Sequence, residues 1–320
     1  MAESIYLKGG DLILEDRVSE KTDLLIKDGT IAAIGRELSA QTDLSGVKEI
    51  DASGHYIGPG YIDMHVHGTR EFLIDRGAND LAGMCSTLPE YGVTGFLPTV
   101  LPLVPGKDTA LLKSLAKVQS TGASMLGFFL EGPFVALTGA IPPDALGSPT
   151  RKRIESLIDA VKPYRAIFAV SPDLKGVIDL IPLMANQDAA SRTAVFMTHT
   201  AASVKETQDG IAAGISHATH FYDVFPAPEE TDPGVRPCGA VEAILADPTV
   251  SVDFILDGEH VDPIAVKMAL ECKGPGGVCL VTDANLGAAL PPGKYDGLGG
   301  QQIEFAYAGA PARICGSVHN

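Results

Sequence analysis

Hydrophobic and polar residues follow two different patterns along this chain. Residues 4–57 form short alternating segments broken by turns, with an Asp-Gly hairpin signal at Asp28 and Gly29. After these residues, apolar runs of strand length alternate with longer stretches of helical spacing. The pattern predicts a small β unit over residues 1–56 and a larger α/β domain over residues 57–320.

The larger segment contains eight candidate strands. Continuous apolar strands separated by helices are typical of a parallel sheet that is buried on both faces. Eight of them favour a closed (β/α)8 TIM barrel, with a doubly wound open sheet as the alternative. The candidate strands are residues 61–67, 94–100, 125–133, 166–172, 194–200, 219–225, 251–260 and 277–284. The candidate helices between them are residues 80–92, 107–119, 151–161, 174–185, 203–214, 240–246 and 263–273.

The composition excludes several classes of protein. The 320 residues are 45% hydrophobic and 20% charged, which is the balance of a soluble globular protein. A net charge of −16 argues against nucleic-acid partners and gives no attraction to a membrane. The N-terminus lacks the basic start and apolar stretch of a signal peptide, and no window approaches the roughly 18 apolar residues of a membrane helix. We therefore expect a cytoplasmic protein.

The cysteines give no sign of a disulfide frame or of a cysteine-type zinc site. They are five in number, at scattered spacings and without a C-x-x-C pair. We expect reduced thiols that serve as packing groups. They are Cys85, Cys238, Cys272, Cys279 and Cys315.

A His-x-His motif ends the first predicted barrel strand. Because side chains alternate across a strand, His65 and His67 point to the same side and could hold one ion together. The motif alone is weak, since with 8 histidines in 320 residues roughly 0.2 chance matches are expected. Its position at a strand end strengthens it.

Four further polar residues fall at the same end of other predicted strands. They are Glu131, His199, His220 and Asp283. Imidazole and carboxylate groups are the usual ligands of a zinc-class ion, and barrel enzymes work at the C-terminal ends of their strands. The sequence therefore predicts a metal-dependent hydrolytic site that these residues form with His65 and His67.

Each of these residues also has a structural interpretation. A single histidine at a strand end is more often a satisfied structural group than a ligand, and we interpret His55, His217 and His319 in that way. Glu131 alone could cap a loop, and Asp283 alone could cap a helix. Several converging buried charges favour a metal, because an isolated buried charge needs a partner.

The motifs together resemble one family. Residues 58–68 (GPGYIDMHVHG), 130–134 (LEGPF), 214–221 (GISHATHF), 257–261 (DGEHV) and 281–284 (VTDA) are similar to those of the N-acetylglucosamine-6-phosphate deacetylases of the amidohydrolase superfamily. The resemblance runs in order from about residue 5 to the end of the chain. It implies a barrel flanked by a small β-sandwich made from both chain ends, and a homodimer.

The resemblance also assigns roles to the site residues. Glu131, His199 and His220 would hold the main divalent ion. His65 and His67 would bind a second ion, with Glu131 shared, although some members use one metal. Asp283 matches the catalytic acid/base. The expected cofactor is therefore a divalent metal, zinc, as one or two ions.

Departures from the family pattern concern the substrate. Ile141 occupies the place of a histidine that orients the amide carbonyl, and Asp223 that of an asparagine. Thr231 replaces an arginine that helps to hold the sugar phosphate, a loss that would weaken charge-assisted phosphate binding. His260 keeps its match, and Arg236 could substitute for the missing arginine.

The expected reaction is hydrolysis of the N-acetyl amide of an amino sugar, N-acetylglucosamine-6-phosphate, to glucosamine-6-phosphate and acetate. The metal would activate water and polarise the acyl oxygen, and Asp283 would transfer the proton. One alternative is a related amidohydrolase that acts on a non-phosphorylated N-acyl or cyclic amide; another is an inactive binding protein. The sequence ends at GSVHN, where the family continues into a last helix and strands, so we expect an incomplete small domain.

Overall fold

The computed structural model describes residues 4–101, 106–188, 190–297 and 301–316. Contacts divide the chain into two compact units, residues 1–61 and 62–320. His319 lies outside the described residues. Among the described helices, none is long and apolar enough to cross a membrane.

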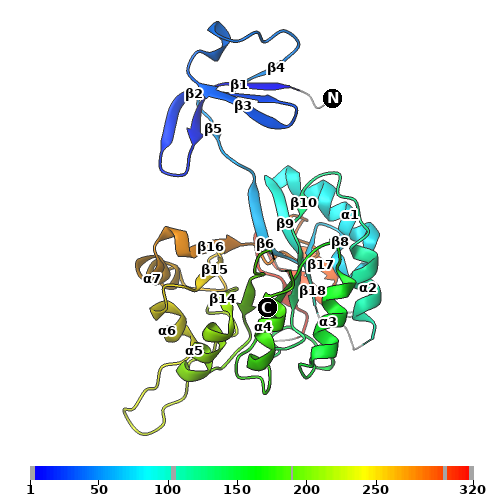
Figure 1. The fold of residues 1–320 in the computed structure, drawn as a ribbon, viewed down its shortest axis with the longest axis vertical. Helices are drawn as coiled ribbons and strands as arrows, with labels where there is room; N and C mark the ends of the chain where they lie inside the picture. Colours follow the sequence, from blue (N-terminus) through cyan, green and yellow to red (C-terminus); the bar gives the residue numbers. More distant parts are fainter. Residues whose placement is uncertain (1–3, 102–105, 189, 298–300, 317–320) are drawn as a thin grey trace. The chain divides into compact units, whose positions relative to one another are not determined.

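The first unit is a small mixed β-sheet (Figure 1). Its strands run in the order β3-β2-β1-β4, and β5 also pairs with β1. The Asp-Gly signal is confirmed, because Asp28 (φ 50°) and Gly29 (φ 75°) form the tight turn between β2 and β3. The strands are β1 (Ile5–Ile13), β2 (Val18–Lys27), β3 (Thr30–Gly35), β4 (Lys48–Asp51) and β5 (Tyr56–Ile57), with a short 3-10 helix at Leu38–Ala40.

The second unit contains a nearly closed barrel of eight strands, as the pattern predicted. The strands follow one another in chain order, β6-β9-β11-β12-β13-β14-β15-β16, and β10 adds a short pairing to β9. A parallel bridge from Val66 to Ala284, and a hydrogen bond from the His67 amide to the Ala284 carbonyl (2.8 Å), link the first strand to the end of the last. The closed barrel is therefore favoured over an open sheet.

The barrel strands are short and mostly buried. They are β6 (Tyr61–Val66), β9 (Val93–Val100), β11 (Phe128–Glu131), β12 (Ala166–Val170), β13 (Val195–Met197), β14 (Ile215–Ala218), β15 (Ser251–Ile255) and β16 (Val278–Val281), with β10 at Ser124–Met125. One prediction was wrong: residues 219–225 form a loop, and the strand precedes them at Ile215–Ala218.

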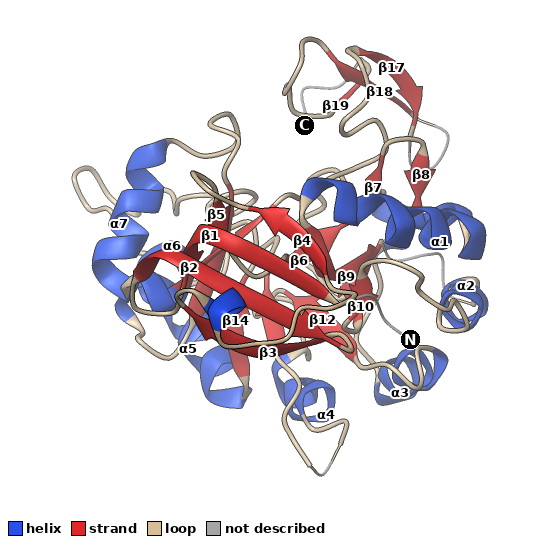
Figure 2. Cartoon of the chain, turned by 90° about the horizontal axis from the view of Figure 1, so that it is seen from above, coloured by secondary structure: helices blue, strands red, loops and turns tan. Residues whose placement is uncertain are grey.

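Helices lie outside these strands (Figure 2). All seven predicted helical segments contain a helix, although the one over 174–185 is reduced to a single five-residue α-helix after a 3-10 turn at Ile178–Leu180. The helices are α1 (Ala78–Thr87), α2 (Asp108–Leu115), α3 (Arg151–Ala160), α4 (Ile181–Ala185), α5 (Val204–Ala213), α6 (Ala240–Ala246) and α7 (Pro263–Lys273). Further 3-10 turns lie at Ile74–Arg76, Leu88–Tyr91, Pro143–Ala145 and Pro275–Gly277.

Short strands follow the barrel at the C-terminal side of the second unit. Within the described residues no helix follows β16; instead β17 (Gly293–Asp296), β18 (Gln302–Phe305) and β19 (Arg313–Ile314) form an antiparallel sheet. Ile303 of this sheet packs with Leu73 of β8 (Phe72–Leu73), which pairs with β7 (Gly68–Thr69). The small sheet thus lies beside the β7-β8 hairpin (Figure 2).

Alternate residues of β11 face two different parts of the barrel, the layer of helices and the barrel interior. Phe128 and Leu130 of β11 pack into the large cluster that includes residues of the helices, whereas Phe129 packs into a separate cluster formed by strand residues alone. Because side chains two residues apart share a face, Glu131 lies on the same side as Phe129. The last residue of β11 therefore directs its carboxylate to the inner end of the barrel.

Candidate metal centre

His65 and His67 come together at the end of β6. Their Nε2 atoms lie 3.1 Å apart, and the His65 ring packs at a tilt against Phe129, with ring centroids 4.8 Å apart. Both histidines are buried, with 0% and 5% of their surface exposed. Burial removes the water that would otherwise solvate these nitrogens, so they depend on partners within the site.

Glu131 lies between two pairs of histidines. Its Oε1 is 3.1 Å from His199 Nε2 and 3.0 Å from His220 Nε2. Its Oε2 is 3.1 Å from His67 Nε2 and 3.5 Å from His65 Nε2. The two oxygens of one carboxylate thus each face a separate pair of imidazoles.

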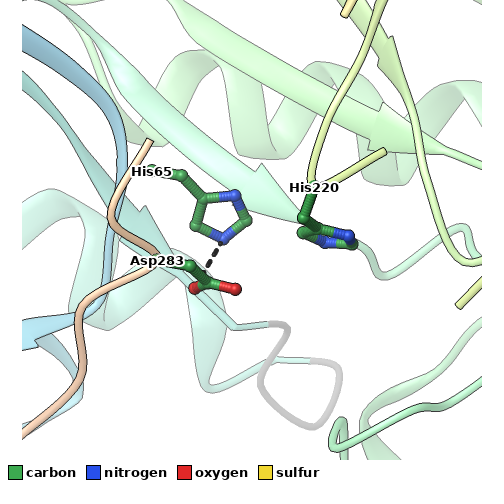
Figure 3. Close-up of side chains that lie close together, drawn as sticks. All are labelled: His65, His220 and Asp283. Atoms are coloured by element: carbon green, nitrogen blue, oxygen red, sulfur yellow. Dashed lines mark ion pairs between the residues drawn. The ribbon is translucent and has the colours of Figure 1, made fainter. Parts of the chain in front are cut away.

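Asp283 closes the same group from the segment after β16. One of its carboxylate oxygens lies 3.3 Å from the Nε2 atom of both His65 and His67. Figure 3 shows His65, Asp283 and His220 meeting from three separate parts of the chain. The six residues that were singled out at predicted strand ends therefore meet in one place.

Three of these residues have left-handed backbone conformations. The φ angles are 48° at His199, 33° at His220 and 47° at Asp283. Such angles are uncommon outside glycine, and they concentrate at functional sites where the surrounding structure holds them. Here they occur immediately after strand ends and turn the side chains toward the centre.

The two carboxylates of the site favour a positive charge on the groups around them. Burial disfavours a charged imidazole, but bonds to Asp283 and Glu131 outweigh it and raise the pKa of His67 to about 10. At His220, burial also lowers the pKa, but the hydrogen bond to Glu131 and the charge of Glu131 outweigh burial and raise the pKa to about 10. The pKa values of Glu131 and Asp283 are lowered despite burial, chiefly by the charge of His65.

The donor set fits a divalent ion. Ligand atoms lie within 4.8 Å of one another in three groups: Glu131 with His199 and His220, His65 with His67 and Glu131, and His65 with His220 and Asp283. The Nδ1 atoms of His67 and His220 are buried without a partner among the described residues. Imidazole and carboxylate suit a zinc-class ion, which binds in place of the protons that such histidines otherwise hold.

A cavity of about 340 Å³ opens onto this cluster. Its wall combines the metal-site residues with apolar side chains from several loops and from the small C-terminal sheet. The lining residues are His67, Leu101, Glu131, Gly139, Ala140, Ile141, His199, His220, Asp223, Val224, Ile255, His260, Asp283, Asn285, Gln301, Ile303, Ala312 and Ile314. The predicted substrate residues Ile141, Asp223 and His260 are among them.

The remaining residues that the sequence singled out lie outside this metal centre. Arg236 and Thr231 are exposed on the loop before α6 and are not among the described lining residues. His55 is exposed, and its Nδ1 contacts the Ser53 carbonyl. His217 is buried, and its Nε2 lies 2.8 Å from a carboxylate oxygen of Asp253, as expected of a structural histidine. All five cysteines are free.

Two further residues at the site, Asp253 and Thr219, were not predicted from the sequence. Both are fully buried, and Asp253 accepts a hydrogen bond from the amide of His220 at 2.6 Å. A signal existed, because Asp253 interrupts the apolar strand V-D-F-I-L, and a buried carboxylate requires partners.

The curated relatives reported below are all named as deacetylases of N-acetylated amino-sugar 6-phosphates. No family model matches the sequence. The N-acetylglucosamine-6-phosphate deacetylase of Lysinibacillus sphaericus is 31% identical over 303 residues, covering 91% of this chain and 73% of the relative. That of Bacillus subtilis is 29% identical over 313 residues, covering 95% and 76%. An N-acetylgalactosamine-6-phosphate deacetylase of Escherichia coli O157:H7 is 28% identical over 305 residues, covering 93% and 76%.

Solved structures agree in fold. N-acetyl-D-glucosamine-6-phosphate deacetylase from Mycobacterium smegmatis, solved with N-acetyl-D-glucosamine-6-phosphate, superposes with a TM-score of 0.83 at 22% identity, covering 99% of this chain and 80% of that one. The Pasteurella multocida enzyme gives 0.80 at 21% identity, covering 94% and 77%. Because the Lysinibacillus relative is 31% identical over 91% of this chain, this chain belongs to the N-acetylglucosamine-6-phosphate deacetylase family of the amidohydrolase superfamily.

Proposed function

We propose that this protein hydrolyses the N-acetyl amide of a 6-phosphorylated amino sugar, with N-acetylglucosamine-6-phosphate as the substrate. The observation that carries the proposal is the position of Glu131 between two pairs of histidines, beside Asp283 and at a cavity of about 340 Å³. The names of the relatives support the same reaction.

The site residues take separate roles in this proposal. Glu131, His199 and His220 would hold one divalent ion, and His65 and His67, together with Glu131, would hold a second. Bound there, the metal supplies Lewis-acid polarisation of the acyl oxygen and lowers the pKa of water. We assign zinc, because catalytic zinc sites are commonly built from imidazole nitrogens and a carboxylate.

Asp283 transfers the proton. An aspartate carboxyl is ordinarily ionised at neutral pH, and one carboxylate oxygen of Asp283 lies 3.3 Å from Nε2 of both His65 and His67, at the edge of the metal centre. It can therefore accept a proton from the attacking water and deliver it to the departing amine nitrogen. Acetate and the free amino sugar are then released.

The rest of the cavity binds the sugar. His260, whose Nδ1 lies 2.7 Å from Asp257, is the basic side chain that the described lining offers beyond the metal cluster, and we assign it to the phosphate. Ile141 and Asp223 contact the sugar where the family resemblance places a histidine and an asparagine.

The assembly and location are part of the same proposal. By resemblance to the family, the protein is a homodimer, and the first unit is part of a flanking β-sandwich. Apolar clusters at Tyr6 with Leu25 and Leu38, and at Leu12 with Leu24, support a sheet that is covered on both faces. The free cysteines support a reducing, cytoplasmic location.

Two isosteric variants test the assignment. Asp283→Asn should lower kcat by about 10²- to 10⁴-fold and keep the bound metal, because it removes only the proton carrier. Glu131→Gln should lose both metal and activity. Exposed carboxylates on helices provide matched controls, Asp209→Asn and Glu155→Gln.

Metal content and deacetylation should be measured on the same preparations. The substrates are N-acetylglucosamine with and without the 6-phosphate, and N-acetylgalactosamine-6-phosphate. Normal turnover in Asp283→Asn would refute its role. Equal rates with and without phosphate would instead favour an amidohydrolase of non-phosphorylated amides.

A further inference from the structure

Behind the metal centre, Asp253 forms a second layer of hydrogen bonds. This carboxylate, on β15, is fully buried. Its Oδ1 accepts bonds from the His220 amide at 2.6 Å and from the Thr219 hydroxyl at 3.1 Å. Its Oδ2 lies 2.8 Å from Nε2 of His217. A buried carboxylate with three donors is a fixed acceptor, because each of its oxygens is held by at least one protein partner.

The Thr219 hydroxyl transmits this fixed orientation to His65. An ionised carboxylate can only accept, so the hydroxyl proton of Thr219 points to Asp253. The oxygen of Thr219 lies 3.2 Å from Nδ1 of His65 and must accept there. In the neutral form that binds a metal, His65 therefore carries its proton on Nδ1, and the lone pair of its Nε2 faces the centre, 3.3 Å from Asp283.

His217 secures the other end of this chain of bonds. Its Nδ1 lies 2.7 Å from the Ser251 hydroxyl, and its Nε2 faces Asp253, so both ring nitrogens have partners. The ring also packs against Phe196, with centroids 4.4 Å apart. A histidine held in this way prevents Asp253 from rotating away from Thr219.

We infer that Asp253, through Thr219 and the His220 backbone, is the positioning residue for both metal subsites. It fixes the tautomer of His65 in one subsite and the left-handed turn that presents His220 in the other. This inference rests on the proposed function, because it assumes that both subsites bind ions. Groups behind metal-ligating histidines typically change metal affinity by about 10- to 100-fold.

Metal titration of chelator-treated protein tests the inference. Zn²⁺ and Co²⁺ are the probes, with a chromophoric chelator as competitor, so that each binding event yields its own Kd. Thr219→Val keeps the shape of the side chain but removes the hydroxyl. It should weaken one of two binding events about 10- to 100-fold and leave the other unchanged. Thr219→Ser should restore the native affinity.

Two more variants complete the experiment. Asp253→Asn removes the charge shared by the two subsites and should weaken both events. Thr207→Val is the matched control, because Thr207 is a fully buried threonine on α5 whose hydroxyl has no partner among the described residues. Its affinities should equal those of the native protein.

The outcomes separate this inference from the proposed function. Native affinities in Thr219→Val, or equal losses in Thr219→Val and Thr207→Val, would overturn the positioning role while the metal site stands. A native protein that binds neither Zn²⁺ nor Co²⁺ would overturn the metal site, and this inference with it.

Discussion

Gly139 lies directly behind His199 and leaves no room for a side chain. An added Cβ would be 2.8 Å from His199 Cε1 and 3.0 Å from Val224 Cγ2, and the φ of Gly139 is 51°. Gly139→Ala should therefore push His199 away from Glu131 and weaken metal binding, by roughly tenfold. Metal titration of the chelator-treated variant measures the effect.

A second glycine separates the steric effect from the backbone effect. Gly176 also has a positive φ, 83°, but an added Cβ there meets nothing within 4 Å. Gly176→Ala should lose about 1–2 kcal/mol of stability from the left-handed conformation alone and keep native metal affinity. If both variants bind metal like the native protein, close packing of Gly139 does not position His199.

Asp23 makes the first unit sensitive to acid. Although burial raises the pKa of this carboxyl, bonds from Tyr6 and from the amides of Gly9 and Leu38 outweigh burial and lower it. A lowered folded-state pKa contributes stability that is present above the unfolded-state pKa, near 3.9, and lost as the pH falls through the folded-state value.

The expected result is a loss of protection in β1 and β2 below about pH 4. Hydrogen exchange of these strands, compared between the native protein and Asp23→Asn at each pH, measures it. The native advantage should be largest near neutral pH and disappear in acid, because the variant has no titrating group there. Asp16→Asn, an exposed carboxylate paired with Arg17, is the control. A constant native advantage from pH 6 to pH 3 would contradict the assignment.

At the scale of elements, the sequence predicted the strands and helices that follow from the local pattern of apolar residues. Seven of the eight predicted barrel strands and all seven helical segments are confirmed. They follow from apolar runs and spacing, because continuous burial needs continuous apolar residues. The loop over 219–225 was predicted as a strand from its apolar run. In the structure, Tyr222 and Val224 have φ angles of 80° and 55°, which an extended strand cannot contain.

Tertiary bonds explain that difference. The Phe221 amide donates to the Asp253 carbonyl at 2.8 Å, and the His220 amide donates to the Asp253 side chain. These bonds replace a strand ladder, and nothing within residues 219–225 reveals them. The candidate metal site was predictable because its residues recur at strand ends. A carboxylate within an apolar strand marks Asp253 as a residue that needs partners, but its partners could not be predicted, because they depend on which strands become neighbours.

A hydrogen bond joins the small C-terminal sheet to the loop after β15. Tyr307, between β18 and β19, donates its hydroxyl proton to Glu259. Ile303 and Ile314 of the sheet line the same cavity as His260 of that loop. Tyr307→Phe should therefore raise KM by roughly two- to tenfold with kcat and metal content unchanged.

Steady-state kinetics with N-acetylglucosamine-6-phosphate provide the measurement. Tyr56→Phe, an exposed tyrosine of β5 in the first unit, is the matched control and should leave KM unchanged. A fall in kcat without a change in KM would show that the sheet acts on the chemical step and not on the shape of the cavity.

At the scale of the whole molecule, the net charge opposes the proposed substrate. The chain carries −16 at pH 7, and a sugar phosphate is an anion. Long-range repulsion of this kind is screened by salt, since the Debye length falls from about 30 Å at 0.01 M to about 8 Å at 0.15 M ionic strength. The value of kcat/KM for N-acetylglucosamine-6-phosphate should therefore rise a few-fold over that range.

N-acetylglucosamine without phosphate is the control for this salt effect, because a neutral sugar is not repelled. Its kcat/KM should stay constant while that of the phosphorylated sugar rises. The opposite trend, a fall with salt for the phosphorylated sugar alone, would mean that local positive charge at the cavity outweighs the net charge of −16. His260 would then be the first residue to replace, because it is the basic group of the described lining that lies outside the metal cluster. In His260→Gln, the fall with salt should become smaller.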